Sequence, residues 1–427
     1  MKNDSIFLIF LLVSVQALFF QAYGQEPKKV PNGTDGLELT VPPPDPALNS
    51  LQPNEFNGPA STFRIGLGFI YDVTAYSKDE TFRQQMDSAK LDVYNRGKLR
   101  DFRVLGSGVL KTRRPISWKF AYMWDGDNNA WLVRETGVTV GVPELGGNFF
   151  VGRTKVGFST VKVMNGHSPW TNERQMALDA IPILADGIKW IGSLPKSRIF
   201  WNVGYYNDFI SKGQGFSTFA WQGVARIGWL PFNDIKNNKL LHIAGEIEYG
   251  APVDGKFTMK SRPESNPTPQ LINTGSFAAD KATQLGLEIY YRNKRFMMGS
   301  EMVMHSFTAE KADDHKFYGG DFMISYFFTK TVRPYKTDAS VFGFIPVKKS
   351  VFKGGLGEWE GVLHVSSLNL NDGAIKGGKM TRITPMINWY MTKVIRMEFI
   401  YGYGILERYN KTGIVQFFES RIQFTVM

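Results

Sequence analysis

The sequence predicts an all-β protein: a 16-stranded antiparallel transmembrane β-barrel with an inward-folding third loop. Three observations predict this fold class. Many segments of about ten residues alternate apolar and polar side chains, which is the period of a half-exposed strand. Aromatic residues make up 14% of the chain, as the lipid-facing girdles of a barrel require. After residue 24, no apolar run reaches the roughly 18 residues of a membrane-spanning helix.

The composition narrows the function classes. The chain has 427 residues, a formal net charge of +11 and no cysteine, so disulfides, thiolate metal sites and a lipid-modified N-terminal cysteine are excluded. The basic residues are spread over many segments and do not form one stripe, so nucleic-acid binding is not expected.

The N-terminal region divides into two predicted parts. Residues 1–24 are typical of a signal peptide, with an apolar core at 6–20 and small residues near the cleavage position. The alternative is a membrane anchor, but this core is short against the about 20 residues that span a bilayer. Residues 25–62 are rich in proline and polar residues and are expected to form a linker, and residues 63–427 form the barrel domain.

The clearest predicted strand is Ile116–Asp125. Trp118, Phe120 and Trp124 lie on one face, and Lys119 lies on the other. The same alternation recurs at 63–72, 199–206, 219–230, 241–250, 285–292 and 395–405. With the less regular segments, 16 strands are predicted, beginning near residues 63, 99, 116, 131, 148, 186, 199, 217, 240, 282, 296, 317, 357, 380, 395 and 415. An even number suits a closed bacterial barrel.

Connector lengths support the barrel, because outer loops are long and periplasmic turns are short. The connectors 73–98 and 158–185 are long, whereas 293–295 is tight. One connector differs: 329–356 is long on the periplasmic side, so it either hangs below the barrel or folds up into it.

The segment 149–174, FFVGRTKVGFSTVKVMNGHSPWTNER, suggests a pore function. Its first part is a predicted strand with Arg153 and Lys155 on one face, toward the lumen. Lys162 and Arg174 then lie in a loop that is expected to fold inward and narrow the channel. Rings of Arg and Lys favour anions in a narrow pore, and arginine binds phosphate through two donors at once. Two alternatives stay open: pairing of these cations with acidic lumen residues, or a solvated outer loop.

The C-terminal part resembles the phosphate-selective porin O and P family. The resemblance is carried by residues 341–404: VFGFIPVKKSVFKGGLGEWEGVLHVSSLNLNDGAIKGGKMTRITPMINWYMTKVIRMEFIYGYG. We place the resemblance over residues 63–427. It implies a porin in the outer membrane of a Gram-negative bacterium, surrounded by outer-membrane lipid, usually trimeric, which passes phosphate or polyphosphate.

The resemblance also implies site residues. Lys155 matches a strand lysine, Lys162 a lysine of the third loop, and Arg174 the arginine of a Glu-Arg pair in that loop. Arg100 and Arg103 match two basic positions that open the second strand. Asp101 stands where the family often has a third arginine, so a broader anion or another solute remains open.

No catalytic residue, metal site or cofactor is predicted. The five histidines lack the close spacing of metal ligands, and no nucleophile-elbow motif is present. The main hypothesis is passive diffusion of anions, such as phosphate, through a basic constriction. The alternatives are a general or mainly structural barrel without anion selectivity, and a secreted all-β binding protein of stacked sandwiches.

Overall fold

The structure is a computed structural model that describes residues 54–181, 183–210, 212 and 218–426. Every described residue belongs to one compact unit within residues 39–427. The predicted signal peptide and most of the predicted linker lie outside the described residues. Within the last part of that linker, β1 (Glu55–Asn57) pairs with the first barrel strand.

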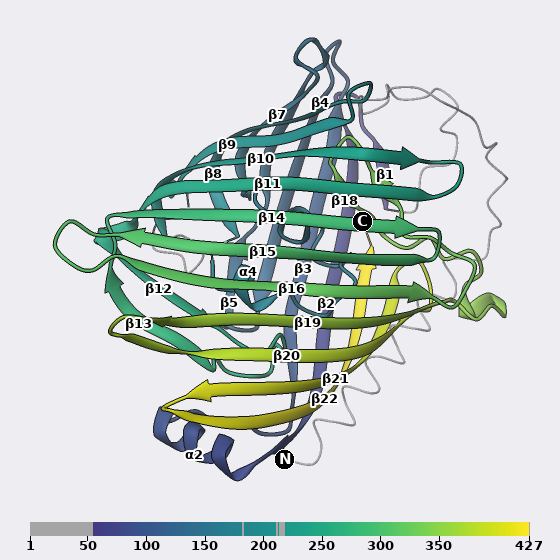
Figure 1. Ribbon diagram of the computed structural model, residues 1–427. Helices are drawn as coiled ribbons and strands as arrows, with labels where there is room; N and C mark the ends of the chain where they lie inside the picture. The colour runs from purple at the N-terminus through teal and green to yellow at the C-terminus, as the bar shows by residue number, and fades with distance from the viewer. Residues whose placement is uncertain (1–53, 182, 211, 213–217, 427) are drawn as a thin grey trace. The chain divides into compact units, whose positions relative to one another are not determined.

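The described part is an antiparallel barrel of 16 strands (Figure 1). In chain order the strands are β2 (Thr62–Lys78), β3 (Arg96–Leu110), β4 (Ile116–Asp125), the interrupted strand β5 (Ala130–Val133) and β6 (Thr136–Val142), β7 (Gly147–Lys155), β8 (Leu184–Leu194), β9 (Ile199–Asn207), β10 (Phe219–Asp234), β11 (Lys239–Pro252), β14 (Lys281–Asn293), β15 (Phe296–Thr308), β16 (His315–Phe327), β19 (Glu358–Asp372), β20 (Ile375–Tyr390), β21 (Ile395–Arg408) and β22 (Lys411–Val426). All 16 predicted strands are confirmed.

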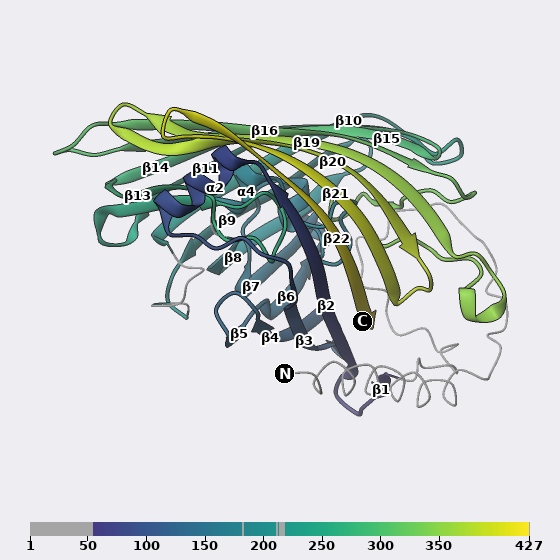
Figure 2. The same cartoon turned by 90° about the horizontal axis from the view of Figure 1, so that it is seen from below.

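The barrel is closed by pairing of its first and last strands. β22 runs antiparallel to β2, from Leu67 opposite Val426 to Lys78 opposite Val415. Figure 2 shows the two strands side by side. Closure removes both sheet edges, so every strand of the barrel has a hydrogen-bonded neighbour on each side.

Strand alternation sets the two faces of the wall. Along β4, Phe120 and Tyr122 are 43% and 37% exposed, whereas Ala121 and Met123 are 8% and 3% exposed. The aromatic side chains therefore face outward and the neighbouring positions face the interior, as the period-two pattern predicted.

The remaining elements are short and lie in the connectors. They are α2 (Glu80–Ala89), α3 (Thr160–Val163), α4 (Met176–Asp179), the strand pair β12 (Lys256–Ser261) and β13 (Ile272–Ala278), the strand pair β17 (Tyr335–Lys336) and β18 (Val341–Phe342), and three 3-10 turns at Pro143–Leu145, Val253–Gly255 and Val351–Lys353. No helix within the described residues has the length and apolar character needed to cross a membrane.

Candidate functional site

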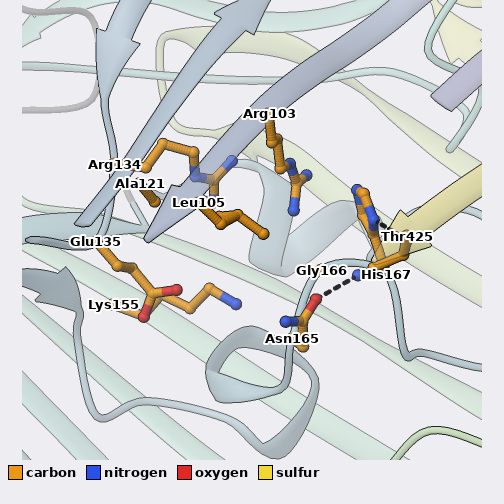
Figure 3. A pocket seen from close by; sticks show the side chains of 10 residues that line it. All are labelled: Arg103, Leu105, Ala121, Arg134, Glu135, Lys155, Asn165, Gly166, His167 and Thr425. Atoms are coloured by element: carbon orange, nitrogen blue, oxygen red, sulfur yellow. Dashed lines mark hydrogen bonds between the residues drawn. The ribbon is translucent and has the colours of Figure 1, made fainter. Parts of the chain in front are cut away.

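Three basic side chains line one small pocket in the barrel. Arg103 comes from β3, Arg134 from the break between β5 and β6, and Lys155 from the last position of β7. We call these three residues the basic cluster. Residues 165–167 line the other side of the same pocket, as Figure 3 shows.

The strand order explains why the cluster forms. β3 pairs with β4, and Arg103 lies opposite Met123 in that pairing. The Arg134 backbone N–H donates to the Ala121 carbonyl at 2.7 Å, and its guanidinium Nη1 lies 3.2 Å from the Met123 sulfur. The Lys155 ammonium donates to the Met164 carbonyl. Three neighbouring parts of the wall thus bring residues distant in sequence to one pocket.

The pocket has a positive charge balance. Its lining holds the three basic side chains of the basic cluster and one carboxylate, Glu135. Just outside this lining, the buried Asp101 carboxylate accepts a hydrogen bond from Arg103 Nη2 at 2.7 Å and so offsets part of the charge of Arg103. Glu135 also accepts a hydrogen bond from the ammonium of Lys119 at 3.0 Å. The surplus of positive charge favours an anion over a cation.

His167 adds no charge to this pocket near neutral pH. Burial, together with the positive charge of Arg103, lowers the pKa of His167 to about 3, although its hydrogen bond with Asp101 acts in the opposite direction. The ring nitrogen Nδ1 lies 2.5 Å from Thr425 Oγ1, and Nε2 lies 3.3 Å from the Asp101 carboxylate. The imidazole therefore serves as a neutral contact between the connector 156–183 and the wall.

The connector between β7 and β8 is largely buried and touches widely separated strands. The backbone N–H of Thr160 donates to Glu288 on β14 at 2.6 Å, and that of Val161 donates to Glu301 on β15 at 3.2 Å. Gln175 donates to Asp321 on β16 at 3.2 Å. Together with the contact of His167 with β22, these bonds join the connector to at least four strands.

Arg100 and Arg421 bind one carboxylate of this connector, Glu173, which directly precedes Arg174 in the sequence. Arg100 donates two hydrogen bonds to Glu173, at 2.5 and 2.8 Å, and also pairs with Asp101. Glu173 accepts a further bond from Arg421 at 2.6 Å. Burial, together with the positive charge of Arg100, lowers the pKa of Arg174 to about 10, so it stays charged at neutral pH. Arg100 is thus neutralised, whereas the Arg174 Nε has no hydrogen-bond partner among the described residues.

Lys162 lies away from the basic cluster. Its side chain is fully buried, its ammonium lies 5.6 Å from the centroid of the Phe158 ring, and it makes no hydrogen bond to a described residue. Burial lowers the pKa of Lys162 to about 8, and the nearby carboxylate of Glu248 on β11 opposes that shift.

Arg153 also lies apart from the pocket. Its side chain is fully buried, and its Nη1 lies 3.6 Å from Asp186 on β8. Of the two basic residues predicted on β7, Lys155 lines the pocket and Arg153 pairs with Asp186.

Two further connectors contribute to the interior, of which the sequence left only 329–356 open. From 329–356, Arg333 donates to Glu360 at 2.8 and 2.9 Å and to the Ser168 carbonyl at 3.0 Å, and the Phe342 ring packs 5.6 Å from that of Trp170. The connector between β12 and β13 supplies a buried carboxylate, described below. Arg134 was missed as well, because it falls in a break between strands where alternation assigns no face.

Comparisons with known proteins agree with the barrel fold. Residues 251–417 match the family described as Phosphate-selective porin O and P. No curated protein matches the chain. Among solved structures, the anion-selective porin of Comamonas acidovorans aligns with a TM-score of 0.53 at 12% identity, covering 86% of this chain and all of that one.

Two further solved structures share the fold. The outer-membrane channel DcaP of Acinetobacter baumannii aligns with a TM-score of 0.53 at 8% identity, covering 87% of this chain and 99% of that one. The trimer form of OmpT of Vibrio cholerae aligns with a TM-score of 0.52 at 12% identity, covering 86% of this chain and 100% of that one. At these identities the likeness shows the fold alone.

The barrel and the family match place the chain in the outer membrane of a Gram-negative bacterium. The predicted resemblance to the phosphate-selective porin O and P family is confirmed over residues 251–417 of the predicted range 63–427, on a barrel whose fold these solved structures share.

Proposed function

We propose that the protein is a passive channel for small anions, with phosphate among them, and that the basic cluster is its selective site. The observation that carries this proposal is the pocket of three cations and one carboxylate between the wall and residues 165–167. In this proposal the connector 156–183 lies in the lumen and narrows it, and Arg174 adds a cation from the connector side.

The physical basis is replacement of hydration. A small anion that enters a narrow pore loses water, and fixed donors such as guanidinium and ammonium groups compensate for that loss. Arg103 and Arg134 provide planar donors for oxyanions, while Lys155 provides a compact charge. No chemical step is required, so we propose a channel without catalytic activity or cofactor. Within the described residues, no group of three metal-binding side chains is present.

Single-channel block tests the solute class. Phosphate added to a chloride solution is expected to reduce the chloride current in a saturable way, because both ions compete for the basic cluster. Sulfate and nitrate are added in parallel experiments as control oxyanions. Comparing their block with that of phosphate shows whether the site responds to the charge of the anion or to its shape. A current that phosphate leaves unchanged at all concentrations would contradict a phosphate site.

The lysine of the connector gives a pH test. A lysine is positive below its pKa and neutral above it, and the pKa of Lys162 is lowered to about 8. If Lys162 contributes to the field along the path, anion preference decreases as the pH rises from 7 to 9. The change is expected to be absent in Lys162→Met, measured as the reversal potential at each pH. A pH dependence equal in both proteins would exclude Lys162 from the path.

The assembly is also part of the proposal. We propose that the aromatic outer face contacts outer-membrane lipid and that the protein is a homotrimer, as in the trimer form of OmpT that shares this fold. Native mass measurement in detergent tests it, and a monomeric mass would contradict it.

A second candidate function is a general or mainly structural barrel. It is favoured by the close pairing of interior charges, such as Arg226 with Glu288 at 2.6 Å and Arg333 with Glu360 at 2.8 Å. If pairing neutralises the whole lumen, the pore conducts without selectivity, and the reversal potential separates the two functions.

A further inference from the structure

The connector between β12 and β13 contains one buried carboxylate with an unusual backbone. Glu264 is 2% exposed and has a φ angle of 53°, in the left-handed region that a residue with a side chain rarely adopts. Such a conformation persists where surrounding contacts fix it.

Two strands of the wall hold the Glu264 side chain. Arg382 on β20 donates to its Oε2 at 2.9 Å, and the Nδ1 of His364 on β19 lies 3.2 Å from the same oxygen. Ser366, also on β19, donates to its Oε1. The neighbouring cations outweigh the effect of burial, so the pKa of Glu264 lies below its ordinary value and the group is a carboxylate at neutral pH.

The same residue binds the connector 156–183. The Met176 backbone N–H donates to Glu264 Oε1 at 3.1 Å, and the side-chain amide of Asn172 donates to the Glu264 carbonyl at 2.7 Å. These two contacts flank Arg174. They fix the backbone on either side of Arg174, and therefore the point from which its side chain extends.

We propose that Glu264 is a positioning residue of the channel: it fixes residues 172–176 against β19 and β20 and thereby holds Arg174 in the anion path. This inference rests on the proposed function. Glu264 does not contact the permeating ion, and it acts by keeping the connector in one position.

The test uses Glu264→Ala in the full-length protein in planar bilayers. The steady open level of the wild type is expected to split into several levels with higher current noise, and the reversal potential is expected to move toward zero. Glu264→Gln keeps an acceptor oxygen for the Met176 N–H. Its current noise and reversal potential are therefore expected to lie between those of the wild type and those of Glu264→Ala. Glu310→Ala, at an exposed carboxylate of another outer connector, is the control. Migration on gels before and after heating verifies that each variant is folded.

An engineered disulfide between the connector and the wall is expected to restore the steady current of the Glu264→Ala variant. A Cβ built on Gly319 of β16 would lie 2.7 Å from the Cβ of Ala177 in α4, so a shift of about 1 Å reaches the usual Cβ–Cβ separation of a disulfide. The chain has no other cysteine that could mispair. Glu264→Ala combined with Ala177→Cys and Gly319→Cys is expected to regain the steady level when oxidised and to lose it again on reduction.

The outcomes separate the two proposals. A folded Glu264→Ala variant with the wild-type current levels and reversal potential overturns the positioning role. Multiple levels that oxidation of the cysteine pair leaves unchanged also overturn it, because the defect then lies outside residues 172–176. A wild type without anion preference overturns the proposed function instead, and the current levels alone then decide whether Glu264 positions the connector.

Discussion

Replacing Arg103, Arg134 and Lys155 together by Gln, Gln and Met is expected to abolish the anion preference of the channel. These side chains line the pocket with a single carboxylate, so their removal leaves Glu135 as its only charged lining residue among those described. Even at the dielectric constant of water, a unit charge about 5 Å from an ion contributes about 0.8 kcal/mol, so three charges change ion partitioning by more than about tenfold.

The measurement is the reversal potential under a salt gradient at about 0.1 M, where screening is moderate. The matched control replaces three other lysines, Lys348, Lys349 and Lys353, whose side chains are exposed in the connector between β16 and β19. Both variants lose three positive charges. If the basic cluster has a specific role, the reversal potential shifts to the cation side in the first variant and changes little in the second. Equal shifts would assign the preference to net charge and not to the basic cluster.

The second large effect is on stability. Glu288→Ala is expected to lower the free energy of unfolding by about 3–5 kcal/mol, because it leaves a buried charge without its partner. The Glu288 carboxylate binds Arg226 at 2.6 Å, His242 at 2.8 Å and the Thr160 N–H at 2.6 Å, and its side chain is 0% exposed.

Urea unfolding in lipid vesicles, followed by tryptophan fluorescence, measures this change. The control is Glu407→Ala, which breaks a pair with Lys379 at 2.8 Å in which both side chains are more than one third exposed. Exposed pairs contribute about 0–1 kcal/mol, so the control is expected to unfold nearly as the wild type. A loss for Glu288→Ala as small as that of the control would show that the buried network does not stabilise the barrel.

The wall of the barrel was predictable because it follows local periodicity. Each strand repeats an inward and an outward residue, so segments such as Ile116–Asp125 reveal their faces without knowledge of their neighbours. Connector lengths then fix the strand order, because neighbouring strands pair through short turns. Agreement of these two independent patterns explains why every predicted strand was confirmed.

The interior was less predictable, since its contacts join residues far apart in sequence. Alternation gave Lys155 a place near the lumen, but it could not show that Glu173 neutralises Arg100 or that Glu264 holds residues 172–176. Arg134 lies at a break between β5 and β6, where the period is interrupted. These positions depend on tertiary contacts that no short window of sequence contains.

The most direct test of the central claim is the reversal potential of the wild-type protein in a planar bilayer under a salt gradient, with and without phosphate. The account predicts a potential on the anion side and a chloride current that phosphate reduces. A potential at zero or on the cation side would contradict a basic selective site and leave a general porin.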